Sequence, residues 1–155
     1  MIKCIVAIDD KRGMANDKGI PWHLPTDLKY YRNQTKQGAI LMGYGTYVEF
    51  DHPFHDRLNY VASSRDEELR DGFEKVADAR QFLKDIKEDV WVIGGARLIE
   101  MTLDLIDEIH ITQLEGDFHC TKFFPEFKDK FKLVSETDPA TENKITFTFQ
   151  IWRKL

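Results

Sequence analysis

The chain has 155 residues, of which 42% are hydrophobic and 32% are charged, proportions typical of a globular protein rather than a disordered one. This length suits a single domain spanning residues 1–155, which can bury a core without disulfides or metals. The formal net charge of −5 argues against a nucleic-acid-binding module. No apolar run is long enough for a membrane-spanning helix, so we expect no membrane role.

Cysteine and histidine usage indicates neither a disulfide framework nor a metal site. Cys4 and Cys120 are the only two cysteines, and we therefore expect a reducing, cytoplasmic location. The apolar start, Met1–Ile8, is too short for a signal peptide. His52 and His55 are three residues apart, but no third residue follows at metal-ligand spacing. Nothing in the sequence requires an oligomer, so we expect a monomer.

Short apolar runs rich in β-branched residues predict the strands. In chain order, these runs are Ile2–Ile8, Ala39–Met42, Leu58–Ala62, Val90–Ile93 and Ile109–Thr112. Four of the five lack polar alternation, which is typical of strands covered on both faces of a parallel sheet. Near the end of the chain, Ile145–Trp152 alternates strictly between apolar and polar residues, which favours a half-exposed or edge strand. Phe131–Val134 is a suitable hairpin partner for that strand.

Helical segments are expected between these strands. Pro25 opens the first helix, because proline is tolerated in a first turn and Asp27 is favourable near the positive end of the helix dipole. A second helix is expected within Val76–Lys87, where apolar residues recur with helical spacing, and a third after Gly94-Gly95. Alternating strands and helices followed by a β-hairpin predict a three-layer α/β domain.

Two predicted strands run directly into glycine turns that are followed by helices. One is Met42-Gly43, with Gly45 and Thr46 beyond, and the other is Gly94-Gly95-Ala96-Arg97. Glycine lets backbone N–H groups approach an anion, and the following helix N-terminus adds a favourable dipole. In α/β sheets, ligands bind at this end of the strands. Either turn alone could be purely structural, but two in one domain favour a dinucleotide.

Two charged side chains are candidates for binding the remainder of a ligand. Asp27 can share one helix face with Leu28 and Tyr31, which would hold a carboxylate against a flat apolar ligand. Alternatively, Asp27 is an exposed acid that only stabilises its helix. Arg57 could hold a carboxylate in a bidentate pair, or it could be a surface residue paired with Asp56.

Three further features have simple interpretations. Ser63-Ser64-Arg65 follows a strand and would suit a phosphate, although a charged turn fits equally well. Cys120 is expected to be a loop residue. Phe123-Phe124-Pro125 is expected in the core.

The segment Pro21-Trp22-His23-Leu24-Pro25-Thr26-Asp27-Leu28 resembles the P-W-x-L-P-x-D-L segment of the dihydrofolate reductase family. Other matching elements follow the family's order along nearly the whole chain. They are Ile5 and Ala7, Met42-Gly43 with Thr46, Arg57, Ser63-Ser64-Arg65, Ile93-Gly94-Gly95, Thr112 and Phe123-Phe124-Pro125-Glu126. The resemblance implies an eight-stranded, mostly parallel sheet with flanking helices and an antiparallel C-terminal strand. It also implies that Asp9–Leu24 forms a mobile active-site loop.

The resemblance implies an oxidoreductase that reduces dihydrofolate to tetrahydrofolate with NADPH, for one-carbon metabolism, and that is a target of antifolates. Asp27 would bind the pterin, Thr112 would hydrogen-bond to the Asp27 carboxylate, and Trp22 would help to order a water. The other implied substrate-binding residues are Ile5, Ala7, Leu28, Tyr31, Phe50, Phe54, Ile93 and, at the glutamate tail, Arg57. The implied cofactor-binding residues are Ala7, Met14, Ile20, Gly43, Tyr44, Gly45, Thr46, Ser63, Ser64, Arg65, Ile93, Gly94, Gly95, Ala96, Arg97 and Leu98.

Several positions depart from the family pattern. They are Tyr44 in place of a basic residue, Ile99 in place of an aromatic residue near the nicotinamide, Asp56 and Ala15 in place of glycines, and Thr121-Lys122 where an aspartate is usual. Tyr44 removes an expected contact with the cofactor phosphate, which Arg65 and Arg97 could replace. None of the departures removes the central carboxylate.

Two other functions remain open from the sequence. Reductases of the same fold that act on a ribosylated pyrimidine in riboflavin synthesis share the glycine turns, but they lack the P-W-x-L-P-x-D segment. A non-catalytic ligand-binding protein with this fold is favoured by Tyr44, Ile99 and Asp56, and opposed by the Asp27–Thr112 pair.

Overall fold

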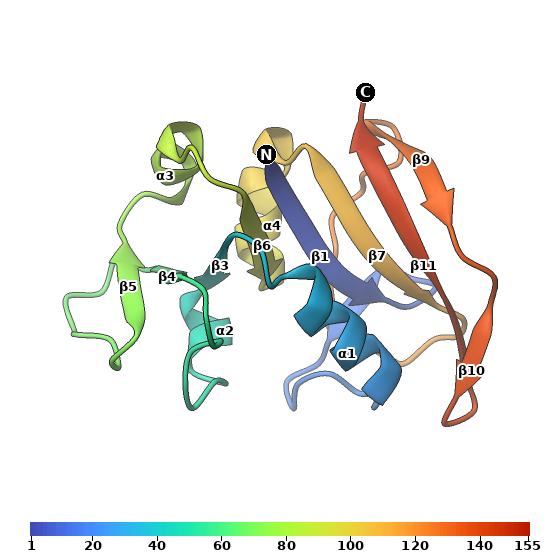
Figure 1. Ribbon diagram of the computed structural model, residues 1–155. Helices are drawn as coiled ribbons and strands as arrows, with labels where there is room; N and C mark the ends of the chain where they lie inside the picture. The colour runs from blue at the N-terminus through green and yellow to red at the C-terminus, as the bar shows by residue number, and fades with distance from the viewer.

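The computed structural model describes residues 1–155 and contains one large twisted sheet with helices on both faces (Figure 1). Its strand order is β10 (Ala140–Glu142), β11 (Ile145–Lys154), β7 (Glu108–Leu114), β1 (Ile2–Ile8), β6 (Val90–Gly94), β3 (Ala39–Gly43), β4 (Asn59–Ala62) and β5 (Phe73–Val76). A ninth strand, β9 (Phe131–Glu136), also pairs with β11. Because β9 and β10 pair antiparallel with different stretches of β11, they act as one interrupted edge strand, which makes the expected eight.

The five strands predicted from apolar runs are all present, and they are parallel to one another. β1 pairs with β6 and β7, and β3 pairs with β6 and β4. The buried residues on successive positions of β1, β3, β6 and β7 confirm that both faces of these strands are covered. The expected antiparallel C-terminal strand is β11, which pairs with β7, and its predicted hairpin partner is β9.

The helices are α1 (Pro25–Gln34), α2 (Tyr44–Tyr47), α3 (Ala79–Asp85) and α4 (Ala96–Thr102), with a 3₁₀ turn at Leu103–Leu105. The second predicted helix, expected within Val76–Lys87, is α3, and Val76 itself ends β5. The helix begins at Ala79, where the Asp78 side chain caps it by accepting a 3.1 Å hydrogen bond from the Gln81 N–H. None of these helices combines the length and the apolar composition that a membrane span requires.

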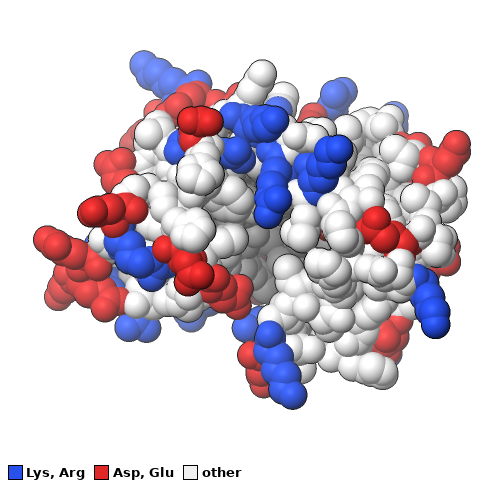
Figure 2. Space-filling model, turned by 60° about the horizontal axis from the view of Figure 1, so that its bottom comes forward, with Lys and Arg blue, Asp and Glu red and all other residues white.

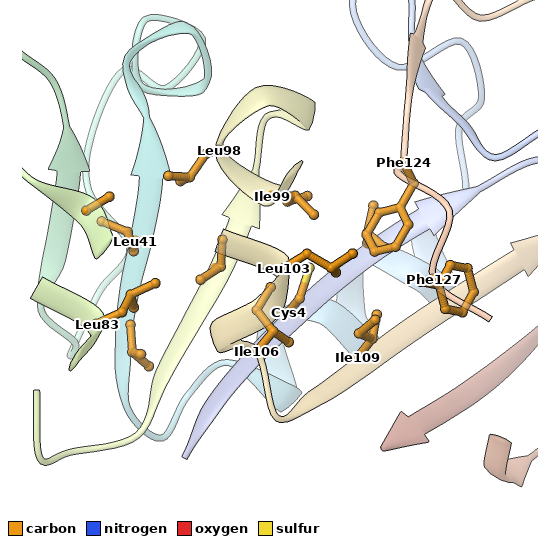
Figure 3. Close-up of a cluster of buried hydrophobic side chains, with 14 of the residues drawn as sticks. Cys4, Leu41, Leu83, Leu98, Ile99, Leu103, Ile106, Ile109, Phe124 and Phe127 are labelled. Carbon is orange, nitrogen blue, oxygen red and sulfur yellow. The ribbon is translucent and has the colours of Figure 1, made fainter. Parts of the chain in front are cut away.

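Most of the hydrophobic core lies between the sheet and the layer that contains α3 and α4. Figure 3 shows these side chains, which include the labelled residues Cys4, Leu41, Leu83, Leu98, Ile99, Leu103, Ile106, Ile109, Phe124 and Phe127. Phe124 is fully buried there, as expected. The opposite face of the sheet has a smaller cluster, against which Tyr30 and Tyr31 of α1 pack. The two clusters confirm the three-layer arrangement.

Helix α1 covers the sheet without burying any residue completely. Its half-buried residues are Asp27, Tyr30, Tyr31 and Gln34, which recur at helical spacing on one face. This face is only half-buried because part of it forms the wall of a cleft.

The segment expected to form the active-site loop is tied to the body of the protein. Within it, β2 (Gly13–Ala15) pairs antiparallel with β8 (Lys122–Phe123). Asp9, which is 1% exposed, accepts hydrogen bonds from the backbone N–H groups of Lys11, Gly13 and Phe118 at 2.8–3.0 Å. These bonds satisfy the buried carboxylate and fix where the loop begins.

Candidate active site

A cleft of about 1500 Å³ opens where the parallel strands end. Its walls include Ala7 near the end of β1, Gly43 at the end of β3, Ser63 after β4, Gly95 after β6 and Thr112 near the end of β7. Figure 2 shows the hollow near the middle of one face, with Lys and Arg side chains gathered along one rim. This is the edge at which the sequence predicted ligand binding.

Asp27 lies inside this cleft and is held by Thr112. The Thr112 hydroxyl donates a hydrogen bond of 2.6 Å to Asp27 Oδ1, which joins the first turn of α1 to β7. Thr112 is 2% exposed and Asp27 is half-buried. The alternative that Asp27 is merely an exposed first-turn acid is therefore wrong.

The environment of Asp27 favours its neutral form. Burial raises the pKa of the Asp27 carboxyl, the Thr112 hydrogen bond lowers it, and the negative charge of Glu142 raises it further. Burial is the largest of the three effects. A carboxyl group with a raised pKa in a cleft is typical of a functional site.

Apolar and aromatic side chains form the wall beside Asp27. Leu28 and Tyr31 come from α1, and Phe50 and Phe54 come from the segment after α2. The Tyr31 and Phe54 ring centroids are 5.9 Å apart, and those of Phe50 and Phe54 are 5.2 Å apart. The arrangement suits a flat aromatic ligand whose polar edge faces Asp27.

Arg57 stands behind this aromatic wall rather than among the residues that line the cleft. Its guanidinium lies 5.5 Å from the Phe54 ring centroid and donates 2.9 Å hydrogen bonds to Thr35 Oγ1 and to the His55 carbonyl. Asp56, which replaces the family's glycine, has φ = 60°, a left-handed conformation that glycine adopts more easily. Arg57 does not pair with Asp56, because its bonds go to Thr35 and His55.

The two glycine turns lie side by side in the opposite half of the cleft, because β3 and β6 are neighbouring parallel strands. Gly43 precedes α2 and Gly95 precedes α4, and neither helix has a side chain that caps its first turn. A Cβ atom added at Gly43 would lie 3.6 Å from the Gly95 nitrogen. First-turn N–H groups without caps, close to each other and beside Arg97, suit a diphosphate.

Arg65 and Tyr44 are in contact at the outer end of the half of the cleft that contains the glycine turns. The Arg65 guanidinium lies 4.3 Å from the Tyr44 ring centroid, and the Tyr44 hydroxyl donates a hydrogen bond to Glu67. The guanidinium thus lies over the ring in a cation–π contact, and its side-chain N–H groups make no hydrogen bond within the protein. Tyr44 carries no positive charge itself, but its ring holds the charged side chain of Arg65 at this end of the cleft.

Most of the predicted site residues line this one cleft. They are Ile5, Ala7, Met14, Ile20, Trp22, Asp27, Leu28, Tyr31, Gly43, Tyr44, Gly45, Thr46, Phe50, Phe54, Ser63, Ser64, Arg65, Ile93, Gly95, Ala96, Arg97, Leu98 and Thr112. Gly94 does not line it but lies next to it, since a side chain there would approach Thr46. Ile99 is 0% exposed in the core, so the expectation that this position borders the nicotinamide was wrong. The cause is that Ile99 lies on the face of α4 that packs against the sheet.

Other residues of the cleft were missed. Phe123 was expected in the core, but it is 46% exposed and lines the cleft with Thr121 and Lys122. Successive residues of an extended segment point to opposite sides, so burial of Phe124 turns Phe123 outward. The missed residues Glu100 and Met101 lie on α4 one turn after Arg97, a spacing that could have indicated them.

Comparisons of the sequence with a family model and with known proteins point to the same family. The model of the family described as dihydrofolate reductase matches residues 1–154. A dihydrofolate reductase of Bacillus subtilis is 32% identical over 154 residues, covering 97% of this chain and 91% of the relative. A dihydrofolate reductase of Drosophila melanogaster is 29% identical, covering 97% of this chain and 96% of the relative.

A solved structure supports the fold independently. It is a dihydrofolate reductase from Enterococcus faecalis complexed with NADP(H) and RAB-propyl, and it superposes with a TM-score of 0.89 at 20% identity. The match covers 99% of this chain and 96% of the other. With the family match over nearly the whole length and the Asp27–Thr112 pair in its cleft, this chain belongs to the dihydrofolate reductase family.

Proposed function

We propose that this protein carries out its family's reaction, the NADPH-dependent reduction of 7,8-dihydrofolate to 5,6,7,8-tetrahydrofolate for one-carbon metabolism, in the cleft that contains Asp27. The observation that carries the proposal is the 2.6 Å hydrogen bond from Thr112 to Asp27 inside this cleft. A carboxyl group fixed in this way can bind an amino group and an adjacent ring nitrogen through its free oxygen and its in-plane lone pairs.

The substrate would occupy the half of the cleft beside α1. Asp27 would bind the pterin, with the carbonyl groups of Ile5 and Ile93 available on the same side, and Leu28 and Phe54 would contact the aminobenzoyl ring. Arg57 would reach the α-carboxylate of the glutamate tail from behind Phe54. Its position supports this role, because one side of the guanidinium is held by Thr35 and His55 while the other remains unbonded.

NADPH would occupy the other half of the cleft, and it supplies the hydride when bound. The turns at Gly43 and Gly95 would hold its diphosphate, and Ser64 and Arg65 would contact the adenosine ribose phosphate. The residue types fit the group, because uncapped N–H groups and arginines are ligands for phosphate oxygens. Met14 and Ile20 of the loop between β1 and α1 would cover the nicotinamide.

The protein's contribution to the chemistry is orientation and charge. Holding the two rings in contact in one cleft provides proximity, and the Asp27 carboxylate favours positive charge on the pterin. Reduction of a C=N bond places a hydride on carbon and a proton on nitrogen. Asp27 binds the far side of the ring, so the proton would reach nitrogen through a water ordered near Trp22, which lines the same cleft.

The remaining expectations belong to this proposal as well. We infer that residues 1–155 act as one domain and one monomer in the cytoplasm, without a nucleic-acid partner. Free Cys4, which is buried, and Cys120 suit a reducing compartment.

The experiment that tests the proposed function compares two reactions of the purified chain and measures its binding of NADPH. NADPH oxidation should depend on dihydrofolate and not on a ribosylaminopyrimidine, the substrate expected for the related reductase. Binding of NADPH without turnover of either compound would instead support a non-catalytic binding protein.

A further inference from the structure

Helix α1, which carries Asp27, is capped by a residue from the other end of the chain. Leu24 precedes the helix and offers no capping side chain. Glu142 of β10 takes this place: its Oε1 accepts a 3.0 Å hydrogen bond from the Thr26 N–H, and its Oε2 accepts a 2.6 Å bond from the Thr26 hydroxyl. Both carboxylate oxygens are therefore engaged by the residue directly before Asp27. The negative charge also suits the positive end of the helix dipole.

Glu142 is presented by a short and well-defined turn. It pairs with Ile145 across the β10–β11 hairpin, and the two residues between them, Asn143 and Lys144, have φ values of 52° and 65°. Two left-handed residues in a two-residue loop form the tight turn that matches the twist of a hairpin. Asn143 adds a third bond, donating from Nδ2 to the His23 carbonyl at 2.8 Å. The hairpin thus holds the chain on both sides of Pro25.

The start of α1 is also fixed by contacts with the sheet. Leu24 is 2% exposed and packs in a cluster with Leu114 and Phe147, and its carbonyl accepts the Leu28 N–H at 3.0 Å. Asp27 thus lies in a helical turn that is held by the sheet on one side and by the hairpin on the other. A change of the hairpin contact would move the helix turn relative to Thr112 on β7.

We propose that Glu142 is a positioning residue for Asp27, and that the β10–β11 hairpin uses it to hold the first turn of α1 so that the Asp27 carboxylate stays bonded to Thr112. The proposal rests on the proposed function, in which Asp27 binds the pterin. It assigns the hairpin tip a role in the site although Glu142 does not line the cleft.

Glu142 is the charged group whose field acts on the pKa of Asp27, so its charge effect can be measured. Glu142 remains ionised at neutral pH, because the two Thr26 hydrogen bonds and the nearby His23 hold its pKa below the usual value. Burial is the largest cause of the raised pKa of Asp27, and the negative charge of Glu142 raises this pKa further. The other titratable groups that interact with Asp27 are Tyr30 and Tyr31 of α1, whose pKa values are raised chiefly by burial and also by the Asp27 charge, while His23 interacts with Glu142.

Three variants separate the two effects of Glu142. Glu142→Ala removes the cap and the charge, and it should lower kcat/KM for dihydrofolate by roughly 10- to 100-fold, because a small displacement of a binding group has this cost. Glu142→Gln keeps an oxygen for Thr26 and should recover most of that loss. Glu136→Gln removes a carboxylate of β9 whose hydrogen-bond partner is Gln150, and it should change neither rate nor titration.

One readout does not depend on activity. It is the pKa of Asp27, measured by carbon-13 NMR of the aspartate carboxyl groups during a pH titration of the ligand-free chain. Glu142→Gln should lower the pKa of Asp27 relative to the wild type, and Glu136→Gln should not. Absence of dihydrofolate turnover in the wild type would contradict the proposed function but would leave this titration valid. The positioning role is overturned if Glu142→Ala keeps kcat/KM within about twofold of the wild type, or if both Glu142 variants lose activity equally while the Asp27 titration is unchanged.

Discussion

Thr112 and Asp27, which are 85 positions apart in the sequence, share a hydrogen bond of 2.6 Å between Thr112 Oγ1 and Asp27 Oδ1. The bond links β7 to the first turn of α1 and satisfies one carboxylate oxygen within the protein. Oδ2 has no protein partner in the structure, so it is available to a ligand in the cleft. This asymmetry is why one aspartate can both be fixed in position and bind a substrate.

Asp27→Asn should leave the fold intact and impair turnover severely. Asparagine is nearly isosteric and can still accept from Thr112, but it cannot stabilise positive charge on the pterin. The loss of one charge-assisted interaction costs about 1.5–3 kcal/mol, or roughly 10- to 150-fold in rate. Activity should recover in part at low pH, where solvent protonates more of the substrate. Near-normal turnover of the variant at neutral pH would remove Asp27 from the mechanism.

The same substitution should stabilise the protein at neutral pH. Because burial raises the pKa of Asp27 in the folded state, the folded protein binds a proton more tightly than the unfolded chain. The corresponding stability is present below the ordinary value of 3.8 and is lost as pH rises through the raised value. An asparagine side chain does not ionise and carries no such penalty. We therefore expect a higher free energy of unfolding for Asp27→Asn at neutral pH and a smaller difference in acid.

Urea unfolding at neutral pH and at about pH 4 measures this difference. Asp138→Asn, which changes an exposed carboxylate between β9 and β10, is the matched control and should alter stability little at either pH. A difference that grows toward acid would contradict the sign of the Asp27 shift.

Arg57→Leu should affect binding of the substrate's tail rather than the chemical step. Arg57 lies behind Phe54 and reaches the site only from that side. The variant should raise KM for dihydrofolate by at least about tenfold and spare a pterin that lacks the glutamate. Thr35→Val, which removes one of the two contacts that hold the guanidinium, should have a smaller effect of the same kind. An equal loss with both substrates would show that Arg57 acts through folding.

Arg65 should be the main residue that distinguishes NADPH from NADH. Its guanidinium is held against the Tyr44 ring with free N–H groups, which suits the extra phosphate of NADPH. Arg65→Ala should weaken NADPH binding by roughly tenfold and NADH binding little, and salt should reduce the difference. Tyr44→Arg restores a basic residue but removes the ring that supports Arg65, so it should tighten NADPH binding less than the added charge alone would. If Arg65→Ala weakens both cofactors equally, Arg97 becomes the next candidate.

The sequence predicts the buried parts of this fold well and its short edge elements poorly. β1, β3, β6 and β7 were found because strands covered on both faces must be continuously apolar. β5 was missed because only Val76 of its four residues is buried, so the pattern there is indistinguishable from a helix start. β2 and β8 are too short for periodicity, and their pairing depends on backbone contacts near Asp9.

The candidate site was predicted in its composition and in one contact, the Thr112–Asp27 hydrogen bond that the family resemblance implies, but not in the rest of its geometry. The P-W-x-L-P-x-D segment identifies Asp27, and the glycine turns are visible as motifs, because both are local in sequence. The stacking of Arg65 on Tyr44 and the capping of Thr26 by Glu142 join residues far apart in the chain, and no periodicity encodes them. Ile99 and Phe123 were misplaced because the side toward which each residue points depends on what its neighbour buries.

The central claim is that Asp27 in this cleft serves the reduction of dihydrofolate. The most direct measurement is the rate of NADPH oxidation by the purified chain with and without dihydrofolate, for the wild type and Asp27→Asn side by side. We predict dihydrofolate-dependent oxidation by the wild type and a rate lower by at least about tenfold in the variant at neutral pH. Equal rates in both proteins, or no dependence on dihydrofolate, would contradict the account.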